Sequence, residues 1–216
     1  MKSSKICLLK VVIPLLEEQK AIARFLDHKT KQIDDLIAKK ETLIEKLDEK
    51  RTALISHAVT KGLDPSVPMK DSGIEWLGEI PKHWEVSRPK YLCSRIVDGT
   101  HQTPEYIDFG IPFLTVKNLT VNHGISFENL KYISLESHKE LSKRANPQKG
   151  DILITKDGTL GVTRVVETET EFSIFVTLAL LKPYHFKINS YYFRDVLESK
   201  AVSAQFEARK EGSGLK

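Results

Sequence analysis

Hydrophobic residues near the start of the chain recur at helical spacing over an unusually long stretch. Between Leu15 and Lys61 there is neither glycine nor proline, and Pro14 and Gly62 bound the stretch. Its apolar residues repeat at heptad spacing in two rows three residues apart, with lysines as polar interruptions, which predicts a helix of the coiled-coil type. The apolar residues of this seam are Ile22, Leu26, Ile33, Leu36, Leu43, Leu47 and Leu54.

Charged residues flank the seam and solvate the rest of the predicted helix. Asp27 with Lys31 and Asp35 with Lys39 have the acid-first spacing of four residues that stabilises a helix surface. At 1.5 Å per residue the helix would be roughly 70 Å long, which suits a spacer or an assembly rod. The sequence contains no second heptad stretch of comparable length, so the partner of the seam must be short or come from another chain. The alternative is one long helix of an ordinary helical domain.

Residues on either side of this helix have a different composition. Residues 1–14 contain the apolar run KICLLKVVIP, which predicts a strand or a loop that closes against another part of the structure. Residues 62–89 are rich in glycine and proline and form a connector. They include Trp76 and Trp84, which we expect to anchor the connector to a domain core. The alternative is that these tryptophans stack on bases.

From residue 90 onward the pattern becomes β-like. The runs IPFLTVKNL, KYISL, GDILITKDG, TLGVTRVVE and EFSIFVTLALLK are rich in β-branched residues and bounded by turn residues, and Asp157-Gly158 is a hairpin dipeptide. Residues 190–210 have the spacing of an amphipathic helix that stops at Gly212. The predicted fold is α+β, with a long coiled-coil-type helix, then a β-rich domain and a C-terminal helix.

Composition narrows the class of protein without naming a partner. The 216 residues are 40% hydrophobic and 29% charged, with a formal net charge of +4, as in a soluble globular protein that tolerates nucleic acid without requiring it. No apolar run approaches the roughly 20 residues of a membrane span, and the N-terminus does not resemble a signal peptide. Cys7 and Cys93 form no metal motif and fit a reducing compartment. We therefore expect a cytoplasmic protein with no membrane partner.

The sequence offers no catalytic constellation. It lacks the glycine-rich loop that binds nucleotide phosphates, and Asn146-Pro147-Gln148 lacks the aromatic residue that would hold a flipped base. The seven histidines are scattered without the spacing of a metal site. Glu198 and Lys200 have the acid-x-Lys spacing of metal-dependent nucleases but stand on the predicted terminal helix. We expect no catalytic residues, no bound metal and no enzymatic activity of the chain itself.

Two polar loops remain as candidates for binding. The segments DGTHQTP (98–104) and KDGT (156–159) combine short hydrogen-bonding side chains with a cation, a pattern that suits base edges and phosphates. The alternative is that Asp98 and Thr100 only cap one turn and that Asp157-Gly158 only forms the other. The candidate DNA-binding residues are Thr100, His101, Gln102, Thr103, Lys156, Asp157 and Thr159, with Lys117, Asn118 and Arg164 as weaker candidates.

Several of these segments together resemble a known family. The stretch from IPLLEEQ to VTKGLD, followed by DSGIEWLGEIPKHWEV, DGTHQTP, GIPFLTVKNL, GDILITKDGTLG and GSGLK, resembles the central part of the specificity subunit of type I DNA restriction-modification systems. Such subunits carry two target-recognition domains, each reading one half of a split DNA site, separated by conserved helices. The resemblance implies that residues 1–14 are the tail of a preceding recognition domain and 15–61 a spacer helix. Residues 62–89 would be the connector and 90–216 a DNA target-recognition domain, incomplete at its C-terminus.

The same resemblance implies partners. A subunit of this family is not catalytic: it holds methyltransferase subunits, which use S-adenosylmethionine, and through them restriction subunits, which use ATP and Mg, on double-stranded DNA. No cofactor is expected in this chain. Because only one recognition domain is present, we expect a homodimer or a second half-subunit to supply the other. The alternative is a truncated scaffold or gene fragment that does not bind DNA.

Overall fold

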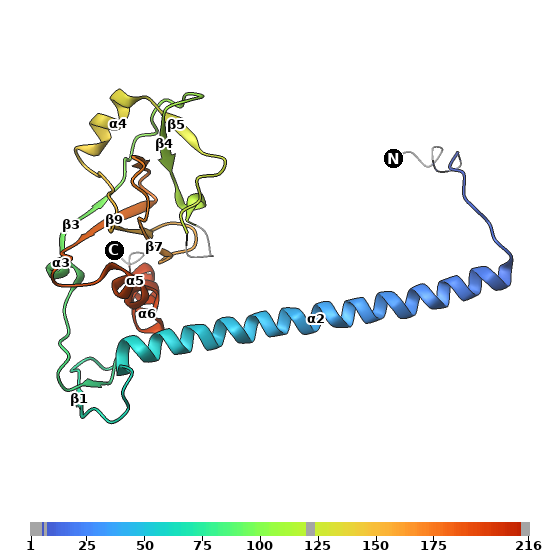
Figure 1. Cartoon of the computed structure of the whole chain (residues 1–216), viewed down its shortest axis with the longest axis horizontal. Helices are drawn as coiled ribbons and strands as arrows, with labels where there is room; N and C mark the ends of the chain where they lie inside the picture. The colour runs from blue at the N-terminus through green and yellow to red at the C-terminus, as the bar shows by residue number, and fades with distance from the viewer. Residues whose placement is uncertain (1–5, 7, 120–123, 213–216) are drawn as a thin grey trace. The chain divides into compact units, whose positions relative to one another are not determined.

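The structure, a computed structural model, describes residue 6 and residues 8–119 and 124–212. The chain divides into two compact units, residues 1–51 and 52–216 (Figure 1). The first consists mainly of helix α2 (Leu16–Lys61), and the second holds the end of that helix and all the strands. The predicted α+β class, a long helix followed by a β-rich domain, is confirmed.

Helix α2 is continuous over 46 residues, as the heptad pattern predicts. Glu17 and Glu18 in its first turn and Lys61 in its last turn complement the helix dipole. Gly62 ends it in the left-handed conformation, with φ +83°. No residue of α2 is buried, and the seven seam residues are 46–68% exposed. Among the described residues, no helix is both long and apolar enough to cross a membrane.

The apolar run KICLLKVVIP near the N-terminus, predicted to be a strand or a loop, is a loop over its described residues from 8 onward. Over residues 8–15 the chain is a turn followed by irregular structure, without a strand. Of the first three residues of the run, Ile6 is exposed, and Lys5 and Cys7 lie outside the described part of the chain. Leu8, Val12 and Ile13 are all more than 75% exposed, so this apolar segment is uncovered.

The connector contains more structure than its glycines and prolines predict. Strands β1 (Met69–Asp71) and β2 (Glu79–Pro81) form an antiparallel hairpin. Trp84 is half-buried and lies over Gly62, where an added Cβ would be 3.6 Å from the indole. Trp76 is 49% exposed, so of the two tryptophans Trp84 matches the expected anchor better.

Two sheets make up the rest of the second unit. The first is antiparallel, in the order β3 (Cys93–Asp98), β9 (Leu178–Pro183), β6 (Ile152–Thr155) and β7 (Thr163–Val165). The second has the order β5 (Lys131–Ile133), β4 (Ile111–Leu114) and β8 (Ser173–Ile174), with β4 and β8 parallel. Each of the five predicted β-runs contains at least one of these strands. Strand β3 was not predicted.

Five short helices accompany the sheets within the residues that the structure describes. The first, α3 (Pro89–Leu92), leads into β3, and the 3₁₀ helix η1 (Val116–Asn118) follows β4. Helix α4 (Leu135–Ser142) contacts β8, and α5 (Ser190–Glu198) packs on β7. The last helix is α6 (Lys200–Gly212).

The core is divided between two apolar clusters that share strands β6 and β9. Leu153 and Leu180 belong to the first cluster, whereas their neighbours Ile152 and Leu181 belong to the second, together with Phe193 of α5. Successive side chains of a strand point to opposite faces, so both faces of β6 and β9 are buried. This explains the continuous apolar runs ILI and LALL in the sequence.

The predicted single C-terminal helix is wrong, because the structure divides it at Ser199. The backbone of Ser199 is extended (φ −66°, ψ 151°), and its hydroxyl donates to the Val196 carbonyl at 2.6 Å. The Ser199 carbonyl then accepts from the backbone N–H groups of Val202 and Ser203 at the start of α6. Ser199 thus hydrogen-bonds both to the end of α5 and to the start of α6. The apolar spacing continues across this residue, so periodicity alone does not reveal the break.

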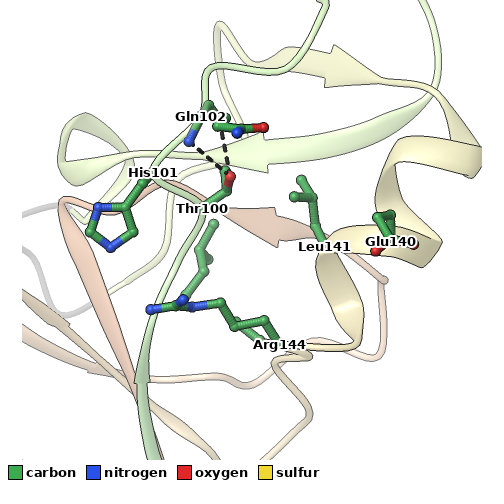
Figure 2. A pocket seen from close by; sticks show the side chains of 8 residues that line it. Thr100, His101, Gln102, Glu140, Leu141 and Arg144 are labelled. Atoms are coloured by element: carbon green, nitrogen blue, oxygen red, sulfur yellow. Dashed lines mark hydrogen bonds between the residues drawn. The ribbon is translucent and has the colours of Figure 1, made fainter.

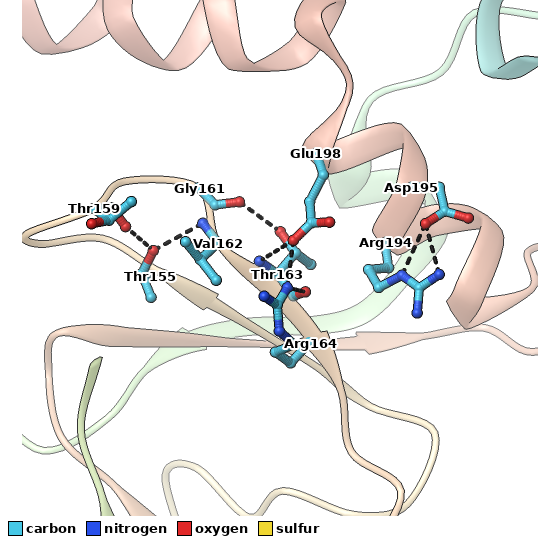
Figure 3. A network of polar contacts seen from close by, with 9 residues as sticks. All are labelled: Thr155, Thr159, Gly161, Val162, Thr163, Arg164, Arg194, Asp195 and Glu198. Carbon is cyan, nitrogen blue, oxygen red and sulfur yellow. Dashed lines mark hydrogen bonds and ion pairs between the residues drawn. The ribbon is translucent and has the colours of Figure 1, made fainter. Parts of the chain in front are cut away.

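A buried ion pair fastens the end of α5 to the edge strand β7. The Arg164 guanidinium, 3% exposed, donates to a carboxylate oxygen of Glu198, which also accepts from the backbone N–H of Thr163 at 3.0 Å (Figure 3). The Arg164 guanidinium also donates to the Thr163 carbonyl. Burial makes the pair costly to break, because the remaining charge would have no partner.

Replacing Arg164 should therefore destabilise the second unit. We expect Arg164→Met to lower its free energy of unfolding by about 3–5 kcal/mol, the usual cost of leaving one buried charge unpaired. The exposed Arg95→Met is the matched control, with an expected change within about 0.5 kcal/mol. Hydrogen exchange of the β6 and β9 amides measures both effects. Equal effects of the two variants would show that the Arg164 pair is not structural.

Cys93, at the start of β3, is 5% exposed. Burial, and secondarily the carboxylate of Asp151, raises the pKa of its thiol from 9.0 to about 11. Since only the thiolate is nucleophilic, Cys93 should be unreactive in the folded protein.

Alkylation tests this property of Cys93. At pH 8 a pKa higher by about two units leaves roughly 100-fold less thiolate, so iodoacetamide should modify native Cys93 at least about 100-fold more slowly than the urea-unfolded chain. Peptide-resolved mass spectrometry separates Cys93 from Cys7. Equal rates in the native and unfolded chains would contradict the buried position.

Candidate nucleic-acid interface

The loop that follows β3 is held against β8 by its backbone. A Cβ on Gly99 would lie 2.2 Å from the Ile174 carbonyl oxygen, so only glycine allows this approach. The Thr100 N–H donates to that same carbonyl at 3.0 Å. The Thr100 hydroxyl donates to the Gln102 carbonyl and accepts from the Gln102 N–H, so it builds the turn. Thr100 thus has the capping role of the alternative interpretation.

The next three side chains of this loop are free to bind. His101, Gln102 and Thr103 are exposed, and among the described residues their side chains have no hydrogen-bond partner. Imidazole, amide and hydroxyl groups both donate and accept hydrogen bonds, as base edges require.

The second predicted loop connects β6 to β7, which confirms the hairpin at Asp157-Gly158. Asp157 accepts from the Gly158 N–H at 2.9 Å, and Gly158 has φ +67°, so these two residues form the turn. The Thr159 carbonyl accepts from the Thr155 hydroxyl, and Thr159 itself is exposed. Lys156 and Thr159 are exposed side chains of this loop that do not form the turn.

The structure joins the two loops at Asp98. The Lys156 ammonium lies 2.7 Å from the Asp98 carboxylate, and each side chain is about one-third exposed. Such a pair adds at most about 1 kcal/mol, so it marks the place where the two loops meet and contributes little to holding them there. The carbonyl of Asp98 accepts a hydrogen bond from a third residue, through Nε of Arg144 at 3.2 Å.

Arg144 was not among the residues predicted from the sequence. It directly follows Lys143 after α4, and the signal that could have revealed it is the adjacent basic pair in SKRANP. Arg95 also donates to this region, to the Lys143 carbonyl at 3.5 Å. The helix dipole favours cations at the C-terminus of a helix, and Lys143 and Arg144 follow the end of α4.

An open pocket lies between the 98–104 loop and the end of α4 (Figure 2). Its volume is about 300 Å³. Its polar rim includes His101, Gln102 and Arg144, and Leu141 and Ile174 supply apolar surface. The polar lining combines the Arg144 guanidinium and the Glu140 carboxylate with the hydrogen-bonding side chains of Thr100, His101 and Gln102. Such a mixture suits recognition of a nucleic-acid group.

Two weaker candidates are corrected by the structure. Asn118 is 8% exposed, and its side chain accepts from the Thr115 N–H at 2.9 Å and donates to the Ser126 carbonyl. Arg164 is buried against Glu198. Both side chains are engaged inside the domain, so we remove them from the candidate interface. Lys117, the third of the weaker candidates, is exposed and stays a candidate.

His138 in α4 lies near a serine and a carboxylate, as the histidine of a catalytic triad does, but this serine is not accessible to a substrate. Nδ1 of His138 lies 2.9 Å from the Ser173 hydroxyl, and Nε2 lies 3.8 Å from the Glu171 carboxylate. Ser173 is completely buried, so its hydroxyl cannot attack a substrate. The hydrogen bond joins α4 to β8. Among the described residues, no group of three or more His, Cys, Asp or Glu residues is placed to hold a metal ion.

Known proteins resemble this chain over most of its length. A Methanocaldococcus jannaschii protein, the putative type I restriction enzyme MjaX specificity subunit, is 29% identical over 81% of this chain and 42% of its own length. The Escherichia coli type I restriction enzyme EcoBI specificity subunit is 28% identical over 79% of this chain and 37% of its own. The chain is similar to type I restriction specificity subunits. The resemblance expected from the sequence motifs is thus confirmed.

The similarity to specificity subunits is partial. The chain spans about 40% of the length of the two curated relatives that it matches. The crystal structure of the HsdS subunit from Thermoanaerobacter tengcongensis matches 88% of this chain and 44% of its own, with 20% identity and a TM-score of 0.43. No protein-family model matches the chain.

Proposed function

We propose that this chain is a DNA-binding specificity subunit, or half of one, that reads one part of a bipartite site in double-stranded DNA. The observation that carries the proposal is the junction at Asp98, which gathers Lys156, Arg144 and the exposed His101-Gln102-Thr103 segment on one surface. Cations supply affinity for the phosphate backbone, and the uncharged side chains supply hydrogen bonds to base edges. The similarity to specificity subunits supports the same function.

The proposal includes the partners of such a complex. The chain itself is not catalytic and binds no cofactor. Methyltransferase subunits, which use S-adenosylmethionine, dock on its long helix, and restriction subunits that use ATP and Mg join through them. The second candidate is a truncated scaffold that retains the helix surface and does not bind DNA, which the 46–68% exposure of the α2 seam also allows.

DNA binding separates these two candidates. We expect the full chain to bind duplex DNA with an affinity that falls as salt rises and to enrich one sequence from a randomised duplex pool. Replacing His101 and Gln102 together by alanine should reduce the preference for that sequence by about 1–3 kcal/mol for each base-specific hydrogen-bonded pair that the substitution removes. Thr170→Ala, an exposed loop change after β7, is the control. Absence of any enriched sequence would favour the scaffold.

The helix requires a partner of its own. Seven apolar side chains lie exposed along one seam, and each such side chain contributes about 1.5–3 kcal/mol when it is fully buried. We propose that a second copy of this chain, or a second half-subunit, covers the seam. A two-fold dimer would place two recognition domains on a palindromic site with a spacer set by the helix.

Two double variants test the seam. Leu43→Asp with Leu47→Asp should abolish association while the β-rich domain stays folded, because the carboxylates would be buried without partners. Ala38→Asp with Thr42→Asp adds the same charge at the same spacing on the outer face and should leave association intact. Light scattering after size exclusion gives the mass of each. A wild-type monomer, or equal association of both variants, would refute the dimer.

A further inference from the structure

The geometry points to Arg144 as a residue that reads a base of the DNA target, with guanine as its expected base. The inference rests on the proposed function and deepens it, because it names one position of the site at which this chain would discriminate. Arg144 directly follows the C-cap of α4 and lies outside both loops that the sequence indicates as binding candidates.

The guanidinium of Arg144 is oriented before any ligand binds. Its Nε donates to the Asp98 carbonyl at 3.2 Å. Asp98 is itself held, by the Lys156 ammonium at its carboxylate and by the pairing of β3 with β9 opposite Ala179. A side chain fixed in this way loses less conformational entropy on binding than a free one.

The outer edge of this guanidinium remains available. With Nε engaged, the two terminal nitrogens form the edge that makes a bidentate contact with O6 and N7 of guanine. Within the described part of the chain, Arg144 has no carboxylate partner. The charge of Lys156 is paired with Asp98 and that of Lys143 with Glu140, so Arg144 differs from both neighbouring lysines.

The surroundings favour a base over a phosphate. The pocket beside Arg144 is concave and holds about 300 Å³, enough for a base edge, whereas a phosphate contact needs no cavity. Gln102 and His101 stand on its rim with unused donors and acceptors (Figure 2). Glu140 also lines it and is paired with Lys143.

A charge-conserving substitution tests the inference. Lysine retains the charge for a phosphate but cannot present the planar edge of arginine. For the full chain selecting from a randomised duplex pool, we expect Arg144→Lys to weaken the guanine preference at one position, by up to about 5- to 150-fold, because the planar two-point contact is lost. The other positions and the salt dependence should be unchanged. Arg88→Lys, which alters an exposed arginine of the connector outside the pocket lining, is the matched control and should retain the full motif.

The outcomes are distinguishable. If the wild type selects a motif and Arg144→Lys keeps the same preference at every position of that motif, with or without a uniform loss of affinity, Arg144 does not read a base and only this inference fails. If the wild type selects no motif, the proposed function fails with it. Thermal unfolding of Arg144→Lys at the wild-type temperature establishes that a changed motif is not the result of misfolding.

Discussion

The burial of β6 and β9 on both faces is the constraint on which the rest of the second unit depends. Each strand sends alternate side chains into two separate apolar clusters, and a shift of one residue would exchange the two sets. The register of β9 sets that of β3, and the register of β6 sets that of β7. Asp98 ends β3 and Lys156 follows β6, so the ion pair between the two loops is a consequence of this core.

The first unit presents the opposite situation. Its helix has good local signals for starting and stopping, yet no residue of α2 is buried. A single helix with a narrow apolar stripe has no core of its own, so most of its stabilisation must come from another surface. The second unit therefore presents its loops from a packed core, whereas the first is a helix whose sequence favours association.

Sequence and structure agree where the physical signal is local. The heptads from Ile22 to Leu54 predict the helix, and the turn dipeptide at Asp157-Gly158 predicts the hairpin. They disagree where a distant residue changes the role of a side chain. Arg164 carries the positive charge typical of a DNA-binding residue, but it is buried in an ion pair with Glu198 of the later helix α5. Asn118 likewise builds its own turn and bonds to Ser126.

The sequence by itself determined the long helix, its apolar seam, the β-rich class of the second unit and the polar loops, because periodicity and turn chemistry act between residues close in the chain. The tertiary structure alone decided which polar side chains share a surface. Asp98, Arg144 and Lys156 meet only because β3 pairs with β9 and β9 with β6, across separations of tens of residues. No local pattern encodes such proximity, since it arises from burying the two faces of one sheet.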